Sequence, residues 1–257
     1  MRLTLLFLLI TTTAMCFAQS EISNIEKKYH GFSLVYSSAD SSIVSSIATM
    51  ISQGNRIVTD YFNHPFKQDF KARVFASRHD LDVQWQKDFH DTTFHSECWM
   101  VAAGDGNGMS ILSPIVWKEQ SCEHNPNDTL EMKRVLTHEL VHVYHGQYNP
   151  NHDFAGLDSL AWFVEGLATF VSGQYDEKRI QQVKNLISQN KEPNQLKNFW
   201  TGKERYALAG SMIAFINTKY GKEKVFELLS QTDQKEMLKM LNTTEAQLIV
   251  SWKKSIQ

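Results

Sequence analysis

The sequence lacks a strong charge of either sign. Its 257 residues contain 26 Lys and Arg against 28 Asp and Glu, so the formal net charge is −2 and the pI is near 6.5. This balance gives no electrostatic reason to expect binding to nucleic acid or to an anionic membrane surface. Low-complexity tracts and repeats of solenoid length are also missing from the sequence. These absences direct the search for a function towards small-molecule or peptide substrates.

Long hydrophobic runs are absent after the first eighteen residues. Residues 1–18 combine Arg2, an apolar run over residues 5–10 and a small residue at Ala18, which predicts a secretory signal peptide cleaved after Ala18. A membrane anchor is the alternative, but the apolar run is shorter than the roughly 20 residues that span a bilayer. We therefore expect a secreted or periplasmic protein with no membrane span in the mature chain.

Cysteine is scarce as well. Removal of the signal peptide leaves only Cys98 and Cys122. An even pair in an oxidising compartment favours one disulfide, and two buried free thiols are the alternative.

The remaining composition, 42% hydrophobic and 21% charged, is that of a globular chain long enough for a packed core in one or two domains. Residues 21–28 are polar and are expected to form a loose start. The patterns predict a strand over residues 31–36, a helix over 40–62 and a strand over 69–76, which together suggest a small α/β unit. A glycine-rich turn over residues 104–108 predicts a β-hairpin rather than a phosphate-binding loop, because no Gly-Lys-Ser/Thr ending follows it.

The most informative stretch is the pattern His138-Glu139-x-x-His142. At 100° per residue these three side chains fall within one 100° arc of a helix, and the two imidazoles stand one turn apart. Such a pair can hold a tetrahedral zinc, and the adjacent carboxylate is placed to take a proton from the water that zinc activates. Chance alone would produce this pattern in about 2% of chains of this composition, so its surroundings must decide.

The surroundings predict a helical second half. The motif helix should begin after Asn127 or Asp128, with Glu131 completing a capping box, and end near Gly146. Further helices are expected over residues 160–171, 177–188, 204–220, 223–229, 234–241 and 245–256. We therefore predict an α+β fold over residues 19–257, with an N-terminal α/β part over about 29–126 and a helical part over about 127–257.

A catalytic zinc needs a third protein ligand and one open position. The candidates downstream of the pair are His145, His152, Asp153, Asp158 and Glu165. His145 lies about 300° around the helix from His142, so we expect it at the helix end or on the surface, away from the metal. Glu165 is favoured because it is a single carboxylate in an otherwise apolar helix, and a buried carboxylate needs a partner. A metzincin would carry Gly at position 145 and His at position 148, and this chain has neither.

These residues resemble the gluzincin metallopeptidases, in particular the peptidase MA-like group. Trp162-Phe163-Val164-Glu165-Gly166-Leu167-Ala168 is similar to the Trp-x-x-Glu-Gly-x-Ala segment of aminopeptidase N-like enzymes. The resemblance implies His138, His142 and Glu165 as ligands of one catalytic Zn²⁺. It also implies Glu139 as the general base.

The resemblance further suggests Tyr206 as the residue that stabilises the oxyanion, with a core or surface tyrosine as the alternative. Thr169, one turn after Glu165, is a candidate partner of a zinc ligand. Aminopeptidase N-like enzymes carry Gly-x-Met-Glu-Asn to bind the substrate amine. Here Gly108-Met109-Ser110 lacks that Glu, which favours an endopeptidase.

Two functions follow from this sequence. The first is a secreted zinc endopeptidase acting on a peptide or protein substrate, whose strand over residues 109–112 pairs with the extended substrate. The second is a non-catalytic extracellular binding module that retains a zincin fold. A structural zinc site needs no carboxylate at position 139 and usually has four protein ligands, so Glu139 favours the enzyme. The sequence predicts no particular oligomeric state.

Overall fold

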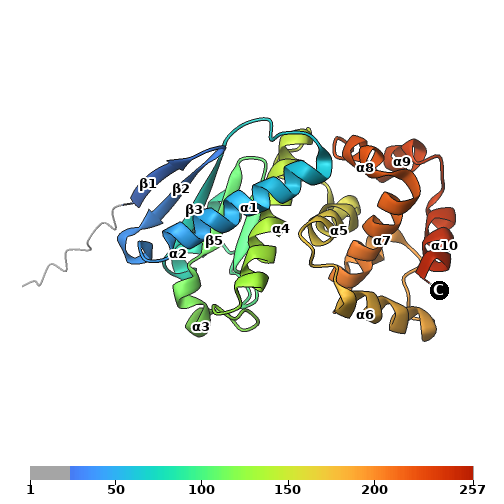
Figure 1. Cartoon of the computed structure of the whole chain (residues 1–257). Helices are drawn as coiled ribbons and strands as arrows, with labels where there is room; N and C mark the ends of the chain where they lie inside the picture. Colours follow the sequence, from blue (N-terminus) through green and yellow to red (C-terminus); the bar gives the residue numbers. More distant parts are fainter. Residues whose placement is uncertain (1–23, 257) are drawn as a thin grey trace, which may run out of the picture.

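The computed structural model describes residues 24–256, and the expected signal peptide lies outside this part of the chain. A five-stranded sheet lies on one side of the molecule and the helices α5 to α10 on the other, which confirms the α+β class (Figure 1). The motif helix α4 (Thr129–Tyr148) lies between these two regions. Within residues 24–256, no helix has the length and apolar character needed to cross a membrane.

The sheet has the strand order β1-β2-β3-β5-β4. Its strands are β1 (Asn24–Tyr29), β2 (Phe32–Ser37), β3 (Phe70–Phe75), β4 (Ala102–Asp105) and β5 (Gly108–Leu112). The central pairs β2–β3 and β3–β5 are parallel, and the outer pairs β1–β2 and β4–β5 are antiparallel. The predicted strands and the predicted hairpin are therefore confirmed as β2, β3 and β4–β5.

Strand β1 corrects the expectation of a loose start. It pairs with β2 along its whole length, from Asn24 opposite Ser37 to Tyr29 opposite Phe32. Its side chains are almost all exposed, so they carry no alternation of apolar and polar residues that would identify a strand. The backbone partner offered by β2, rather than burial, makes this segment a strand.

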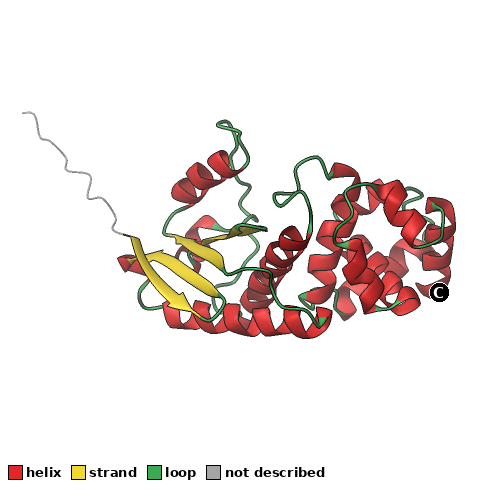
Figure 2. Ribbon diagram, turned by 90° about the horizontal axis from the view of Figure 1, so that it is seen from above, coloured by secondary structure: helices red, strands yellow, loops and turns green. Residues whose placement is uncertain are grey.

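Helix α1 (Val44–Phe62) joins β2 to β3 and packs against α4 (Figures 1 and 2). Gly54 of α1 lies at the contact. A Cβ atom there would lie 2.6 Å from Leu140 Cδ1 and 2.9 Å from Thr137 Oγ1. The missing side chain lets α1 approach the motif helix closely, and the apolar face of α4 is buried as a result.

The helices after the motif follow the predicted pattern closely. They are α5 (Ala161–Val171), α6 (Glu177–Ser188), α7 (Arg205–Tyr220), α8 (Lys222–Leu228), α9 (Gln234–Met240) and α10 (Glu245–Ile256). Two further helices, α2 (Arg78–Asp88) and α3 (Trp117–Gln120), lie before the motif helix. Helices α5 and α7 form the largest helix–helix contact, with Gly166 against the carbonyl of Ala209. This contact holds the apolar helix that carries Glu165.

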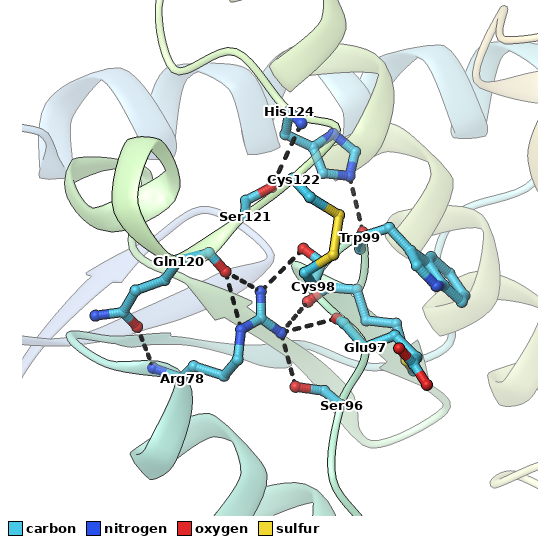
Figure 3. The surroundings of a disulfide bond; sticks show 10 residues. Arg78, Ser96, Glu97, Cys98, Trp99, Gln120, Ser121, Cys122 and His124 are labelled. Atoms are coloured by element: carbon cyan, nitrogen blue, oxygen red, sulfur yellow. Dashed lines mark hydrogen bonds between the residues drawn. A yellow bond between two sulfur atoms is a disulfide. The ribbon is translucent and has the colours of Figure 1, made fainter.

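The segment between α2 and β4 has almost no regular structure, and a disulfide and several hydrogen bonds hold it in place. Cys98 and Cys122 form a disulfide, as the sequence favoured (Figure 3). The guanidinium group of Arg78 donates hydrogen bonds to Ser96 Oγ and to the carbonyl oxygens of Glu97, Cys98, Met100 and Gln120. These ties place Trp99, whose carbonyl also contacts His124 Nε2 at 2.9 Å.

Candidate functional site

Helix α4 presents the motif as predicted. Asp128 caps its start by accepting a hydrogen bond from the backbone N–H of Glu131 at 2.9 Å. The carboxylate of Glu131 does not complete a capping box, because it pairs with His124 at 2.8 Å. The helix also continues past Gly146, the expected end, to Tyr148. The polar side chains of the motif therefore lie in the middle of a regular helix.

His138, His142 and Glu165 converge on one point. Glu165 Oε2 lies 3.2 Å from His138 Nε2 and 3.6 Å from His142 Nε2, and all three potential ligand atoms lie within 4.8 Å of one another. Two atoms bound to one zinc at about 2.1 Å and at tetrahedral angles would lie roughly 3.4 Å apart. The two ligand separations to Glu165 therefore fit a tetrahedral metal ion.

The electrostatics of the three groups also suit a cation. Burial by itself would raise the pKa of Glu165, but the two imidazoles outweigh it and hold that pKa well below its ordinary value. The carboxylate is therefore ionised beside two imidazole nitrogens. A neutral pair of imidazoles with one carboxylate is a common ligand set of catalytic zinc, with a fourth position left open.

Sequence reasoning missed Gln174, which lies in the loop between α5 and α6. Its Oε1 is 2.9 Å from His138 Nδ1, so the imidazole N–H is the donor. This hydrogen bond orients the imidazole ring so that Nε2 of His138 faces Glu165. Nothing in the local sequence identifies this glutamine, because its position depends on the turn after α5.

The expected ligand partner, Thr169, is not seen in that role. Its Oγ1 is buried and makes no hydrogen bond among the described residues. Nδ1 of His142 is also buried without a hydrogen bond among the described residues. A side chain, that of Gln174, therefore supports the imidazole of His138, and none supports that of His142.

Glu139 is buried beside the ligands and next to strand β4. Its pKa is raised to about 7, mainly by burial and also by the charge of Glu165, while His138 and the backbone of Gly104 oppose the rise. A Cβ atom on Gly104 would lie only 2.5 Å from the carbonyl oxygen of Glu139. Glycine at this position thus allows the strand to approach the motif helix at the carboxylate.

Tyr206, at the start of α7, lies at the same site. Its ring centroid is 6.1 Å from that of His138. Burial raises the pKa of its phenol, and the negative charges of Glu165 and Glu139 add to this effect. The hydroxyl therefore stays protonated and can donate a hydrogen bond.

His145 corrects a prediction. It lies in the last turn of α4, as expected, but it is only 1% exposed and is not a surface residue. Its ring packs against Phe154 and Phe163, and its Nε2–H donates to the carbonyl of Leu229 at 3.1 Å. The side of α4 away from the metal faces other elements rather than solvent, which the helical angle alone does not reveal.

The expected substrate strand, residues 109–112, is also placed differently. These residues form β5, whose two edges are already paired with β3 and β4. A peptide cannot pair with an interior strand, so this prediction is wrong. Within residues 24–256, β4 is the edge strand on this side of the sheet, and Ala102, Ala103 and Gly104 line a cleft that also contains the candidate metal ligands. The cleft has a volume of about 1090 Å³.

Comparison with known families points to the same chemistry. Residues 121–208 match the family model described as collagenase, a family of zinc metallopeptidases. The matched segment is about a third of the chain and contains every candidate site residue from His138 to Tyr206. Among proteins of curated function, no sequence matches this chain.

Proposed function

We propose that this chain is an exported zinc endopeptidase of the gluzincin type. The observation that carries the proposal is the convergence of two imidazole nitrogens and one carboxylate oxygen at zinc-like separations, beside a buried Glu139 and open to a large cleft. The match of this segment to a family of zinc metallopeptidases supports it. The layout of the two zinc helices also supports the resemblance to the peptidase MA-like group.

His138, His142 and Glu165 are the proposed zinc ligands. Zinc held there supplies Lewis-acid chemistry, which polarises a peptide carbonyl and makes water a stronger nucleophile near neutral pH. Gln174 keeps the ligating nitrogen of His138 directed at the site.

Glu139 is the proposed general base. It takes the proton from the attacking water and delivers it to the amine that leaves, which completes hydrolysis of the peptide bond. Its elevated pKa lies near neutral pH, where a group can both accept and return a proton. Tyr206 is proposed to donate a hydrogen bond to the oxyanion that develops on the carbonyl.

The free edge of β4 is the proposed binding site for the substrate backbone. An extended peptide can form main-chain hydrogen bonds with an unpaired strand edge. Ala102 offers its backbone groups there, because hydrogen-bonded pairs alternate along β4 and Ala103 is paired with Ser110 of β5. The side chain of Ala102 is too small to block the edge. The description of the matched family makes collagen-derived peptides reasonable first substrates. The signal peptide that the sequence predicts over residues 1–18 and the Cys98–Cys122 disulfide support export.

A non-catalytic binding module is less well supported. A structural zinc site usually has four protein ligands, whereas the described residues bring three together at an open cleft.

The Glu139→Gln variant tests the proposal. It removes the base while leaving the ligands, so peptide hydrolysis should fall by about 10²- to 10⁴-fold. Bound zinc, measured by elemental analysis, should stay near one per chain. Chelation should abolish activity in the unmodified enzyme, and added zinc should restore it.

Glu223→Gln is the matched control, because Glu223 is an exposed carboxylate on α8, far along the chain from the motif. It should hydrolyse peptides at the normal rate. Full activity of Glu139→Gln, or active protein without zinc, would overturn the proposal.

A further inference from the structure

The two walls of the cleft touch each other through one arginine. The guanidinium carbon of Arg205 lies 4.9 Å from the ring centroid of Trp99 and 5.1 Å from that of Trp200. The N-terminal wall of the cleft includes residues 99–104, and the C-terminal wall includes lining residues between 157 and 207. Trp99 therefore belongs to the N-terminal wall, and Arg205 and Trp200 belong to the C-terminal wall. We call these three residues the arginine bridge. All three are half-buried and line the cleft that holds the metal ligands.

Each end of the arginine bridge is held in place. On the N-terminal side, the disulfide and the Arg78 hydrogen bonds fix the backbone on both sides of Trp99 (Figure 3). On the C-terminal side, Arg205 is the first residue of α7, and the Trp200 ring meets the Tyr206 ring edge-on at 4.8 Å. The bridge is thus formed by side chains whose backbones are already positioned.

The bridge lies at one end of the proposed substrate strand. Trp99 is three residues before Ala102, where β4 begins, and β4 passes Glu139 at Gly104. A peptide that pairs with β4 and extends beyond its first residue therefore meets the bridge. A single linear chain can pass it by threading a free end, whereas a chain without ends requires the bridge to open.

We infer that the arginine bridge restricts this site to linear, unfolded peptide chains that enter by a free end. This inference rests on the proposed peptidase function, and it makes Trp99, Arg205 and Trp200 specificity-determining residues. Only the contact of Arg205 with Trp99 joins the two walls, and Trp200 holds Arg205 in place from its own wall. An exposed cation–π contact corresponds to about a two- to fivefold change in an equilibrium constant, so this contact would disfavour the open form by about that factor.

The test compares one peptide sequence in linear and head-to-tail cyclised form. A ring of roughly 20 residues can still offer an extended segment, because a strand rises only about 3.4 Å per residue. The zinc-loaded enzyme should have a kcat/KM for the linear form about two- to fivefold above that for the ring. In Trp99→Ala and in Arg205→Ala, this ratio should fall by about the same factor. Arg205→Lys keeps the charge and should give an intermediate ratio.

Lys219→Ala is the matched control. It removes cation–π contacts to Phe215 and Tyr220 from the other end of the same helix α7. The ratio of linear to cyclic kcat/KM should stay at its original value in this variant. Trp99 and Arg205 lie on opposite walls, so if one of the two variants fails to fold, the other still gives the ratio of linear to cyclic kcat/KM without the bridge.

The outcomes separate the two proposals. Equal cleavage of the linear and cyclic peptides by the unmodified enzyme, or an unchanged ratio in the folded bridge variants, overturns the bridge inference alone. If the zinc-loaded enzyme cleaves neither form, nor any member of a broad linear peptide library, the proposed function fails and the inference falls with it.

Discussion

The two walls of the cleft are each stabilised by a different kind of interaction. The N-terminal wall contains a long irregular segment before β4, and directional ties hold it: one disulfide and the hydrogen bonds of Arg78. The C-terminal wall consists of packed helices, in which α5 and α7 bury side chains such as Leu167 and Ile213 completely. Helix α4 lies between the walls and supplies two of the three metal-ligand candidates.

This difference reflects where the backbone finds its hydrogen bonds. A helix satisfies its own amides, so non-directional burial of apolar side chains is enough to hold it. An irregular segment has no such internal partners and buries little, so covalent and polar ties must offset the conformational entropy that it loses. Loss of one disulfide or hydrogen bond should therefore destabilise the wall that carries Trp99 more than loss of one apolar contact destabilises the helical wall.

The largest effect is expected where α4 joins the helical side, at His145. Burial lowers the pKa of this histidine from 6.5 to about 3. Below pH 6.5 His145 is protonated in the unfolded chain, whereas in the folded chain it stays neutral down to about pH 3. The free energy of unfolding should therefore fall by about 1.4 kcal/mol per pH unit across this window from this one residue.

Urea denaturation at about pH 7, 5 and 4, in the presence of a chelator, measures this effect. His145→Asn should be less stable than the original chain near pH 7, because the contact with Leu229 is changed, but its stability should fall less steeply with acid. Parallel pH dependences of the two proteins would contradict the buried, neutral state of His145.

The next effect concerns the irregular wall. Replacing both Cys98 and Cys122 by serine should lower the free energy of unfolding by about 3 kcal/mol, since the disulfide closes a loop with a sequence separation of 24 residues. Reductant should destabilise the original chain by a similar amount and leave the double variant unaffected. A double variant as stable as the original chain would show that Arg78 alone holds this wall.

The smallest effect concerns the loop after α5, where the helical wall reaches a metal ligand. Gln174→Ala removes the acceptor for His138 Nδ1–H, so zinc affinity should fall about 10- to 100-fold in competition with a chelating dye. Gln174→Glu keeps an acceptor and should retain the affinity. Gln182→Ala, which changes another glutamine of the same cleft, is the control and should bind zinc normally. Unchanged affinity in Gln174→Ala would exclude a role for this hydrogen bond.

Much of the local structure was predictable because it depends on neighbours in the sequence. The bounds of α6 and α10 agree with the apolar periodicity, and Asp128 caps α4 as expected. Strand β1 was not predictable, because its exposed side chains show no pattern and its only structural reason is the edge of β2. The interior position of β5 was also not predictable from the sequence, because the order of strands depends on how the connections cross the sheet and not on the composition of one strand.

The sequence by itself determined the pairing of His138 with His142 and the place of Glu139 between them, because one helical turn sets these spacings. It also singled out Glu165 as a carboxylate in an apolar helix. Only the tertiary structure decided that Gln174 supports His138, that His145 is buried and that Trp99 meets Arg205. Each of these contacts joins segments whose approach depends on the packing of whole elements, which no local spacing encodes.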